Sequence, residues 1–214
     1  MPIDALVLGE NTFSFHAFSR MRPLFEAALD APDVDVETTT DRDCLRRLGD
    51  VDVVVDYTTD CAFTDAQLDG LVSFVEDGGG YVGVHGAADL TTTADGRRDE
   101  PHPALRDLLG GHFETHPERT RFAVSVVDSH HPVTADLPAR FSLWDEPYQL
   151  DVDADVTVLA RMDHPELADM PVVWTRAHGD GNVVYCSLGH DRPAFVHDAV
   201  GQLLRNAVRW AADG

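Results

Sequence analysis

The stretch GGGYVGVHGAADL, residues 78–90, decides the fold class. Three glycines end a helical pattern, and residues 81–86 (YVGVHG) then form a short apolar run that is typical of a buried strand. The order of strand, small residue, functional residue and glycine matches a nucleophile elbow, a tight strand-to-helix turn. The pattern predicts that His85 faces a crevice at the carboxyl edge of a sheet, where hydrolases place Ser. The alternative is a histidine that only caps the sheet edge.

Strands and helices alternate on the amino-terminal side of this elbow. The predicted strands are nearly continuous in valine, and Thr64 is a suitable cap for the helix that precedes the glycines. This alternation predicts a doubly wound α/β fold with a mostly parallel sheet covered on both faces. The predicted strands span residues 4–9, 33–38 and 51–58, and the predicted helices span 21–31, 42–49 and 64–80.

The carboxyl-terminal half predicts further elements of the same domain. Residues 103–111 indicate a short helix and residues 119–127 a strand. The Gly-Asp-Gly turn within residues 171–189 predicts a β-hairpin, which we place at or near one edge of the sheet. Pro193 begins one long amphipathic helix that runs to the end of the chain. No repeat or linker divides the chain, so we expect a single domain over residues 1–214.

Length and composition bound the class of protein. The chain has 214 residues and is 43% hydrophobic, which is enough for one substantial core. No apolar run approaches the roughly 20 residues of a membrane helix, and the first residues lack the basic region of a secretory signal. We therefore expect a cytoplasmic protein. Three cysteines without CxxC spacing favour neither a disulfide framework nor a cysteine zinc site.

The charge is strongly acidic. Asp and Glu total 38 against 16 basic residues, all of them Arg, for a net charge of -22. Such a surface repels nucleic acids and anionic membranes, so neither is an expected partner. Because the Asp residues are spread along the whole chain, we interpret the acidity as a halophilic adaptation to a salty cytoplasm. The sequence leaves the oligomeric state open.

Three further motifs follow the elbow in order: GGHFETHPE (110–118), HPVTADLPARFSLWDEPYQL (131–150) and WTRAHGDGNVVYCSLGHD (174–191). Together with the elbow they resemble the trehalose-utilisation, or ThuA-like, family, and the resemblance covers nearly the whole chain. It implies a flavodoxin-like fold related to class I glutamine amidotransferases, with the catalytic Cys absent.

The resemblance also implies a set of site residues. The expected catalytic residues are His85, His116, Glu146, Tyr148 and His190. His16 lies in a loosely patterned loop after the first strand, and we expect it to bind substrate together with Asp191 and Trp144, whose aromatic face would suit a sugar ring. The alternatives without a functional role are that Glu146 only pairs with an arginine and that Trp144 belongs to the core.

These residue types suit two kinds of chemistry. His16, His85 and His190 each follow a predicted strand, so they can converge on one crevice. Imidazoles and a carboxylate gathered there can act as general acids and bases near neutral pH. They can also bind a divalent metal such as zinc, for which the expected ligands are His85, His116 and His190. The spacing His-x-Glu-x-His at residues 112–116 does not match the zincin motif His-Glu-x-x-His.

Two function classes remain open. The first is an enzyme acting on a small carbohydrate, and the family resemblance implies a keto-sugar or glycoside as its substrate. The second is a sugar-binding or regulatory module that keeps the fold without chemistry. Several imidazoles and a carboxylate at one strand edge favour the enzyme. Ordinary acyl transfer is disfavoured because the elbow carries neither Ser nor Cys.

Overall fold

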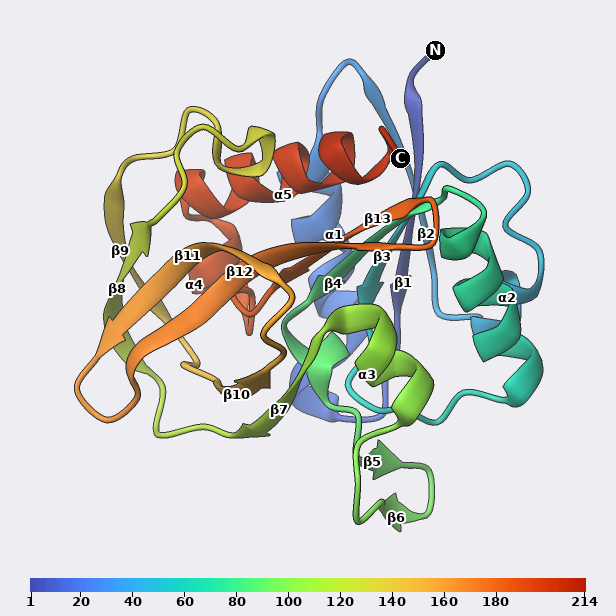
Figure 1. The fold of residues 1–214 in the computed structure, drawn as a ribbon, viewed down its shortest axis with the longest axis horizontal. Helices are drawn as coiled ribbons and strands as arrows, with labels where there is room; N and C mark the ends of the chain where they lie inside the picture. The colour runs from blue at the N-terminus through green and yellow to red at the C-terminus, as the bar shows by residue number, and fades with distance from the viewer.

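A mixed nine-stranded sheet forms the centre of the molecule (Figure 1). The computed structural model describes residues 1–214, except for the side chain of Ala168. The strand order is β2-β1-β3-β4-β13-β12-β11-β8-β9. The bounds are β1 Ile3–Gly9, β2 Val34–Thr39, β3 Val53–Tyr57, β4 Gly80–Val84, β8 Thr120–Val126, β9 Arg140–Asp145, β11 Thr157–His164, β12 Ala168–His178 and β13 Gly181–Cys186.

The sheet has a parallel half and an antiparallel half. Strands β2, β1, β3, β4 and β13 pair in parallel, whereas β13, β12, β11, β8 and β9 pair antiparallel. The predicted α/β, flavodoxin-like architecture is confirmed, although the parallel share is smaller than expected. The predicted hairpin is present as β12 and β13, but its expected position at the edge was wrong. It lies in the middle of the sheet, because β13 pairs with β4 and β12 pairs with β11.

Helices cover both faces of the sheet (Figure 1). Alternate residues of each strand point to opposite faces, so Val7 and Val55 pack with α1, α4 and α5, whereas Leu8 and Val54 pack with α2 and α3. The result is two apolar clusters, one on each side of the sheet. The bounds are α1 Phe18–Leu29, α2 Asp65–Glu76, α3 Pro103–Leu109, α4 Arg192–Phe195 and α5 Asp198–Ala211.

The long closing helix predicted from Pro193 onward is divided into α4 and α5. Pro193 lies in the first turn of α4, as expected, but the helix ends at Phe195. His197 then caps α5, because its side chain accepts a hydrogen bond from the backbone N–H of Ala199. By contrast, the predicted cap of the earlier helix is confirmed: Thr64 forms a capping box with Gln67 at the start of α2.

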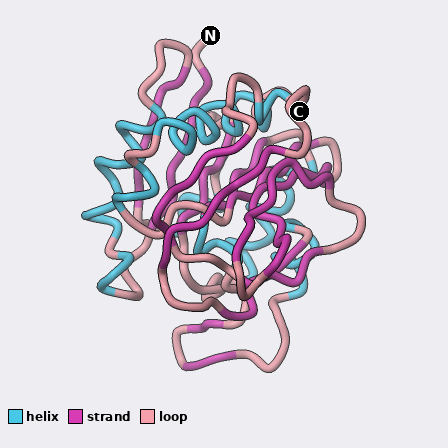
Figure 2. The backbone as a smooth tube through the Cα atoms, turned by 90° about the vertical axis from the view of Figure 1, so that its left-hand side faces the viewer, coloured by secondary structure: helices cyan, strands magenta, loops and turns pink.

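Two small sheets flank the carboxyl end of the parallel strands. Strand β7 (Gly111–Thr115) pairs antiparallel with β10 (Gln149–Val152), and β5 (Thr92–Thr93) pairs with β6 (Gly96–Arg97). The β5–β6 hairpin projects away from the main sheet, at the bottom of both views (Figures 1 and 2). Short 3-10 helices complete the fold: η1 Ser14–His16, η2 Arg42–Arg46, η3 His85–Ala88 and η4 Pro132–Thr134.

The described residues also bear on two expectations from composition. Cys44, Cys61 and Cys186 are free thiols, as the odd count and spacing suggested. Among the helices that the structure describes, none combines the length and apolar character needed to cross a lipid bilayer.

Candidate functional site

A pocket of about 1390 Å³ opens at the carboxyl edge of the parallel strands. The loops after β1, β3 and β13 contribute His16, Thr59 and His190 to its wall, and the β5–β6 hairpin contributes Thr92 and Arg97. In an open sheet with parallel strands, the ligand crevice lies at the point where the strand order reverses direction. That point is β1 here, because β2 and β3 pair with it on opposite sides. The topology therefore explains why residues distant in sequence share one pocket.

His85 occupies a true elbow at the end of β4. Its φ is +48°, in the left-handed region that few residues other than glycine adopt. The side chain is fully buried, and Nδ1 lies 2.8 Å from the carbonyl oxygen of Ser187. Because that carbonyl can only accept, Nδ1 carries the hydrogen, and in the neutral imidazole Nε2 presents a lone pair. The predicted turn is present, but His85 lies behind the pocket wall and does not line the pocket.

Gly86 allows the elbow to pack against the loop after β3. A Cβ atom at this position would lie 2.5 Å from the Thr59 methyl carbon and 2.9 Å from the Thr58 carbonyl oxygen. We expect Gly86→Ala to destabilise the fold by about 1–3 kcal/mol, because the backbone oxygen cannot move aside without shifting the loop. Urea unfolding measures the change. Gly49→Ala is the matched control, since nothing lies within 4 Å of its Cβ position, and an equal loss in both variants would contradict the packing argument.

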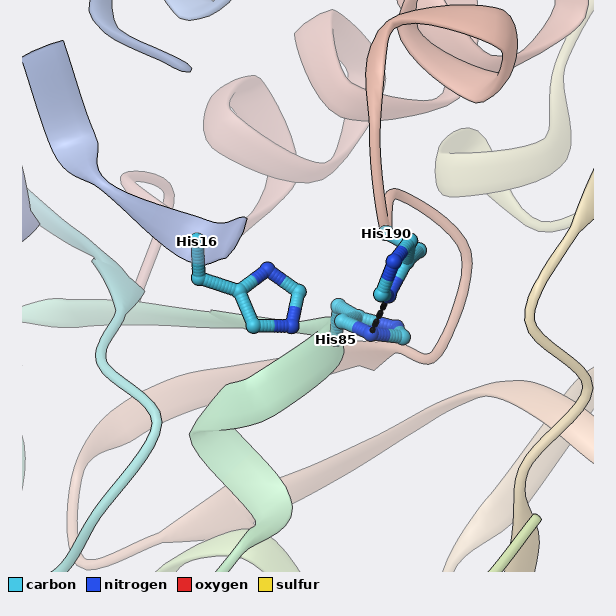
Figure 3. A group of neighbouring side chains, drawn as sticks. All are labelled: His16, His85 and His190. Carbon is cyan, nitrogen blue, oxygen red and sulfur yellow. Dashed lines mark hydrogen bonds between the residues drawn. The ribbon is translucent and has the colours of Figure 1, made fainter. Parts of the chain in front are cut away.

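Three buried imidazoles meet at the base of the pocket: His16, His85 and His190 (Figure 3). His85 Nε2 lies 3.2 Å from His190 Nδ1, and the ring centroid of His16 lies 4.6 Å from that of His190. Burial, followed by the neighbouring imidazoles, lowers the pKa of His16 to about 3. His16 is therefore neutral at physiological pH. The predicted convergence of these three residues agrees with the geometry.

Glu146 is the carboxylate of this cluster. One carboxylate oxygen lies 3.1 Å from His190 Nδ1 and 3.4 Å from His85 Nε2, and the other lies 3.6 Å from His116 Nδ1. Burial alone would raise the pKa of Glu146, but its contacts with the His190 and His85 imidazoles outweigh burial and lower the pKa well below the usual range. The carboxylate is therefore ionised while it faces the pocket.

Tyr148 and His116 complete the expected catalytic set. The Tyr148 ring stacks on His85 with centroids 4.2 Å apart, and burial raises the pKa of its hydroxyl well above the usual value. Tyr148 thus fixes the plane of the elbow imidazole and keeps its own proton. The side chain of His116 is 42% exposed and lines the pocket, in contrast to the three buried imidazoles.

The expected substrate-binding residues divide into two groups. His16 and Asp191 line the pocket, and an Asp191 oxygen pairs with Arg119 at 2.9 Å. Trp144 does not line the pocket. It lies on the outer face of β9 with 47% of its surface exposed, because inward and outward residues alternate along this strand. The pocket wall instead carries Phe13 and Phe15, whose rings stack with centroids 5.3 Å apart.

Asp145 is a site residue that the sequence analysis did not single out. It is fully buried, and its two carboxylate oxygens accept hydrogen bonds from the backbone N–H groups of Gly189 and His190 at 2.8 and 3.0 Å. It therefore ties the end of β9 to the loop that carries His190. The signal was present in the alternation of β9, since Phe141 and Leu143 point inward and place Asp145 on the same face.

The fold and pocket together define a flavodoxin-like α/β protein whose elbow carries an imidazole where related folds carry a nucleophile. Residues 4–211 match the family model described as ThuA, trehalose utilisation. The chain belongs to the trehalose-utilisation (ThuA) family, which confirms the resemblance seen in the motifs. No curated protein matches the chain significantly.

Solved structures agree with this assignment. A ThuA-like protein from Bacteroides uniformis ATCC 8492 is 26% identical, with a TM-score of 0.80 over 98% of this chain and 91% of that chain. A ThuA-like protein from Parabacteroides merdae ATCC 43184 is 16% identical, with a TM-score of 0.82 over 99% and 90% of the two chains. The β-galactosidase from Bacillus circulans sp. alkalophilus is 14% identical, with a TM-score of 0.72 over 98% of this chain and 31% of that chain, and shares the fold alone.

Proposed function

We propose that this protein is an enzyme of carbohydrate metabolism that acts on a keto-sugar or glycoside by removing a proton next to a carbonyl group. The observation that carries the proposal is the ionised Glu146 carboxylate, which faces the pocket and contacts three imidazoles. A passive binding module needs hydrogen-bond partners for sugar hydroxyls, but it does not need a concentrated set of groups able to move protons.

Glu146 is the proposed base. His85 and Glu146 are both expected catalytic residues that could act as a base, and of these two only Glu146 lines the pocket. A carboxylate with a low pKa is a weak base, so its substrate must carry an acidified C–H bond. A ketone at C3 of a sugar acidifies the proton on C2. Removal of that proton leaves its electron pair in the enolate formed by C2, C3 and the ketone oxygen.

Two outcomes follow from the enolate. In elimination, the electron pair forms the C1–C2 double bond, and the anomeric substituent leaves with the electrons of its bond to C1. His116 is the proposed acid for this leaving group, because it is the accessible imidazole beside Glu146. Addition of water, with OH at C1 and a proton returned to C2, completes a net hydrolysis. In isomerisation, the proton is returned without loss of the substituent, and the same base serves.

The walls of the pocket suit a carbohydrate. Its volume of about 1390 Å³ exceeds that of typical pockets for drug-sized ligands, so a glycoside with a second ring fits. The stacked Phe13 and Phe15 rings offer an apolar surface for the C–H face of a sugar. Thr12 and Thr92 also line the pocket. Phe13 and Phe15 therefore take the sugar-binding role that we expected of Trp144.

Hydrogen exchange at C2 tests the proposal. With a 3-keto-glucoside labelled with deuterium at C2, we expect the protein to release the label to solvent, because both reaction courses break that C–H bond. Mass spectrometry follows the loss of the label. The assay contains high salt, since a net charge of -22 repels itself strongly at low ionic strength. Turnover with full retention of deuterium would exclude the mechanism, and binding of the keto-sugar without exchange would favour a non-catalytic module.

A further inference from the structure

The hydrogen bonds of His16 and His85 use one nitrogen of each imidazole, and the two ring centroids lie 5.4 Å apart. His16 Nδ1 lies 3.1 Å from the Tyr57 hydroxyl, whose single hydrogen is directed to the carbonyl oxygens of Gly189 and His190 at 3.1 and 3.0 Å. The hydroxyl therefore accepts from His16 Nδ1–H, as the Ser187 carbonyl accepts from His85 Nδ1–H. In the neutral form of both residues Nε2 is therefore the atom without the hydrogen.

His190 brings a third nitrogen to the same point. Its Nδ1 lies 3.2 Å from His85 Nε2 (Figure 3), and one nitrogen from each of the three residues lies within 4.8 Å of the others. Lone pairs that converge in a buried site repel unless a proton or a cation lies between them. Imidazoles that donate their other N–H to a carbonyl or hydroxyl oxygen are the usual form of metal-binding histidine.

We propose that His16, His85 and His190 bind one divalent transition-metal ion of the zinc type. The ligand set predicted from the sequence contained His116 in place of His16. His116 is the exposed member of the group and lies outside the imidazole trio, whereas His16 is buried within it. The proposal goes beyond the proposed reaction and does not depend on it.

The spacing of the neighbouring carboxylate agrees with such a centre. Tetrahedral zinc with bonds of 2.0–2.1 Å separates its ligand atoms by about 3.3 Å. The Glu146 oxygen lies 3.1 and 3.4 Å from the nitrogens of His190 and His85. Glu146 therefore lies at the edge of such a centre, where it stays free to act as the base while the fourth position is open to a ligand. When bound, the ion would act as a Lewis acid that polarises a carbonyl oxygen of the ligand.

A proton offers a competing arrangement. His190 Nδ1–H could donate to the Glu146 carboxylate, and the trio would then be a hydrogen-bond network without an ion. The two arrangements differ in what the pure protein binds. A network held by a proton has no stoichiometric affinity for zinc, whereas three preorganised imidazoles bind one ion per chain.

Metal titration of the full chain separates these arrangements. Protein freed of metal by a chelator is titrated with Zn²⁺ in a calorimeter and with Co²⁺ in a spectrophotometer, in high salt. We expect one site per chain and the visible absorption of tetrahedral cobalt. His16→Ala is expected to weaken Zn²⁺ binding by at least about 100-fold, because loss of a ligand exceeds the 10–100-fold effect of losing an outer partner. His116→Ala is expected to retain affinity within about threefold.

Several results would overturn the metal site. Weak binding of many ions, equal in the wild-type protein and in His16→Ala, would assign the binding to the acidic surface. Loss of the site in His116→Ala with retention in His16→Ala would restore the ligand set predicted from the sequence. X-ray absorption of the zinc-loaded wild-type protein tests the ligands of the ion without a variant. Coordination of zinc by oxygen atoms alone would also exclude the site. None of these measurements uses a sugar, so they stand apart from the C2 exchange assay.

Discussion

Replacing Glu146 with Gln is expected to slow C2 deuterium exchange and turnover by about 10²–10⁴-fold, the range for loss of a general base. Gln keeps the size of the side chain and an oxygen that can face the imidazoles, but it cannot accept the proton from carbon. The KM should change much less than kcat, because the hydrogen-bonding surface of the pocket is nearly conserved. Steady-state kinetics with a 3-keto-glucoside and exchange measured by mass spectrometry check both statements.

The matched control for this variant is Glu166→Gln, on the turn after β11 and outside the pocket. It makes the same chemical change at an exposed position, so its rates should equal those of the wild-type protein. If Glu146→Gln exchanged deuterium at the wild-type rate, Glu146 would not be the base. A variant that lost binding and kept kcat would instead show that Glu146 only holds the substrate.

Replacing Asp145 with Ala is expected to cost about 2–4 kcal/mol of unfolding free energy, because it leaves the buried N–H groups of Gly189 and His190 without acceptors. The loop that carries His190 should then shift, so catalysis should fall as well, although Asp145 touches no substrate. Asp145 is a positioning residue in this sense. Urea unfolding gives the stability change, and kinetics on the folded fraction give the loss of kcat.

Two further variants bracket this result. Asp145→Asn keeps one acceptor oxygen and should lose about half as much stability as Asp145→Ala. Asp163→Ala removes an exposed carboxylate that pairs with Arg140, so it should change stability by less than about 0.5–1 kcal/mol. A loss for Asp145→Ala no larger than that for Asp163→Ala would show that the two backbone hydrogen bonds do not hold the loop.

The parts of the fold that depend only on residues close in sequence could be predicted from the sequence. The Thr64 cap, the valine-rich strands and the Gly-Asp-Gly turn each act over a few residues, and each is present. The position of the hairpin depends on which strand edges pair, and β4 and β13 lie about 100 residues apart in the chain. The periodicity of apolar residues gives no information on such long-range pairing. The β12–β13 hairpin was therefore wrongly placed at the edge of the sheet.

The sequence predicts which residues form the site better than it predicts how their side chains are arranged. The ends of parallel strands share one edge of the sheet, so the convergence of His16, His85 and His190 follows from their positions after strands. The difference between buried His16 and exposed His116 depends on tertiary packing, which has no signature in the sequence at either residue. The outward direction of Trp144 could be predicted from the alternation of inward and outward residues along β9.

The central place of β13 has a consequence for how the chain folds during synthesis. Residues 3–84 contain four parallel strands that can pair early, but β4 keeps an open edge until residues 181–186 are available. An unpaired apolar strand edge is prone to join other chains, so a nascent or truncated chain that stops before residue 181 should aggregate or recruit chaperones. Because His190 follows the same strand, the pocket also cannot form until β13 and the loop after it have left the ribosome.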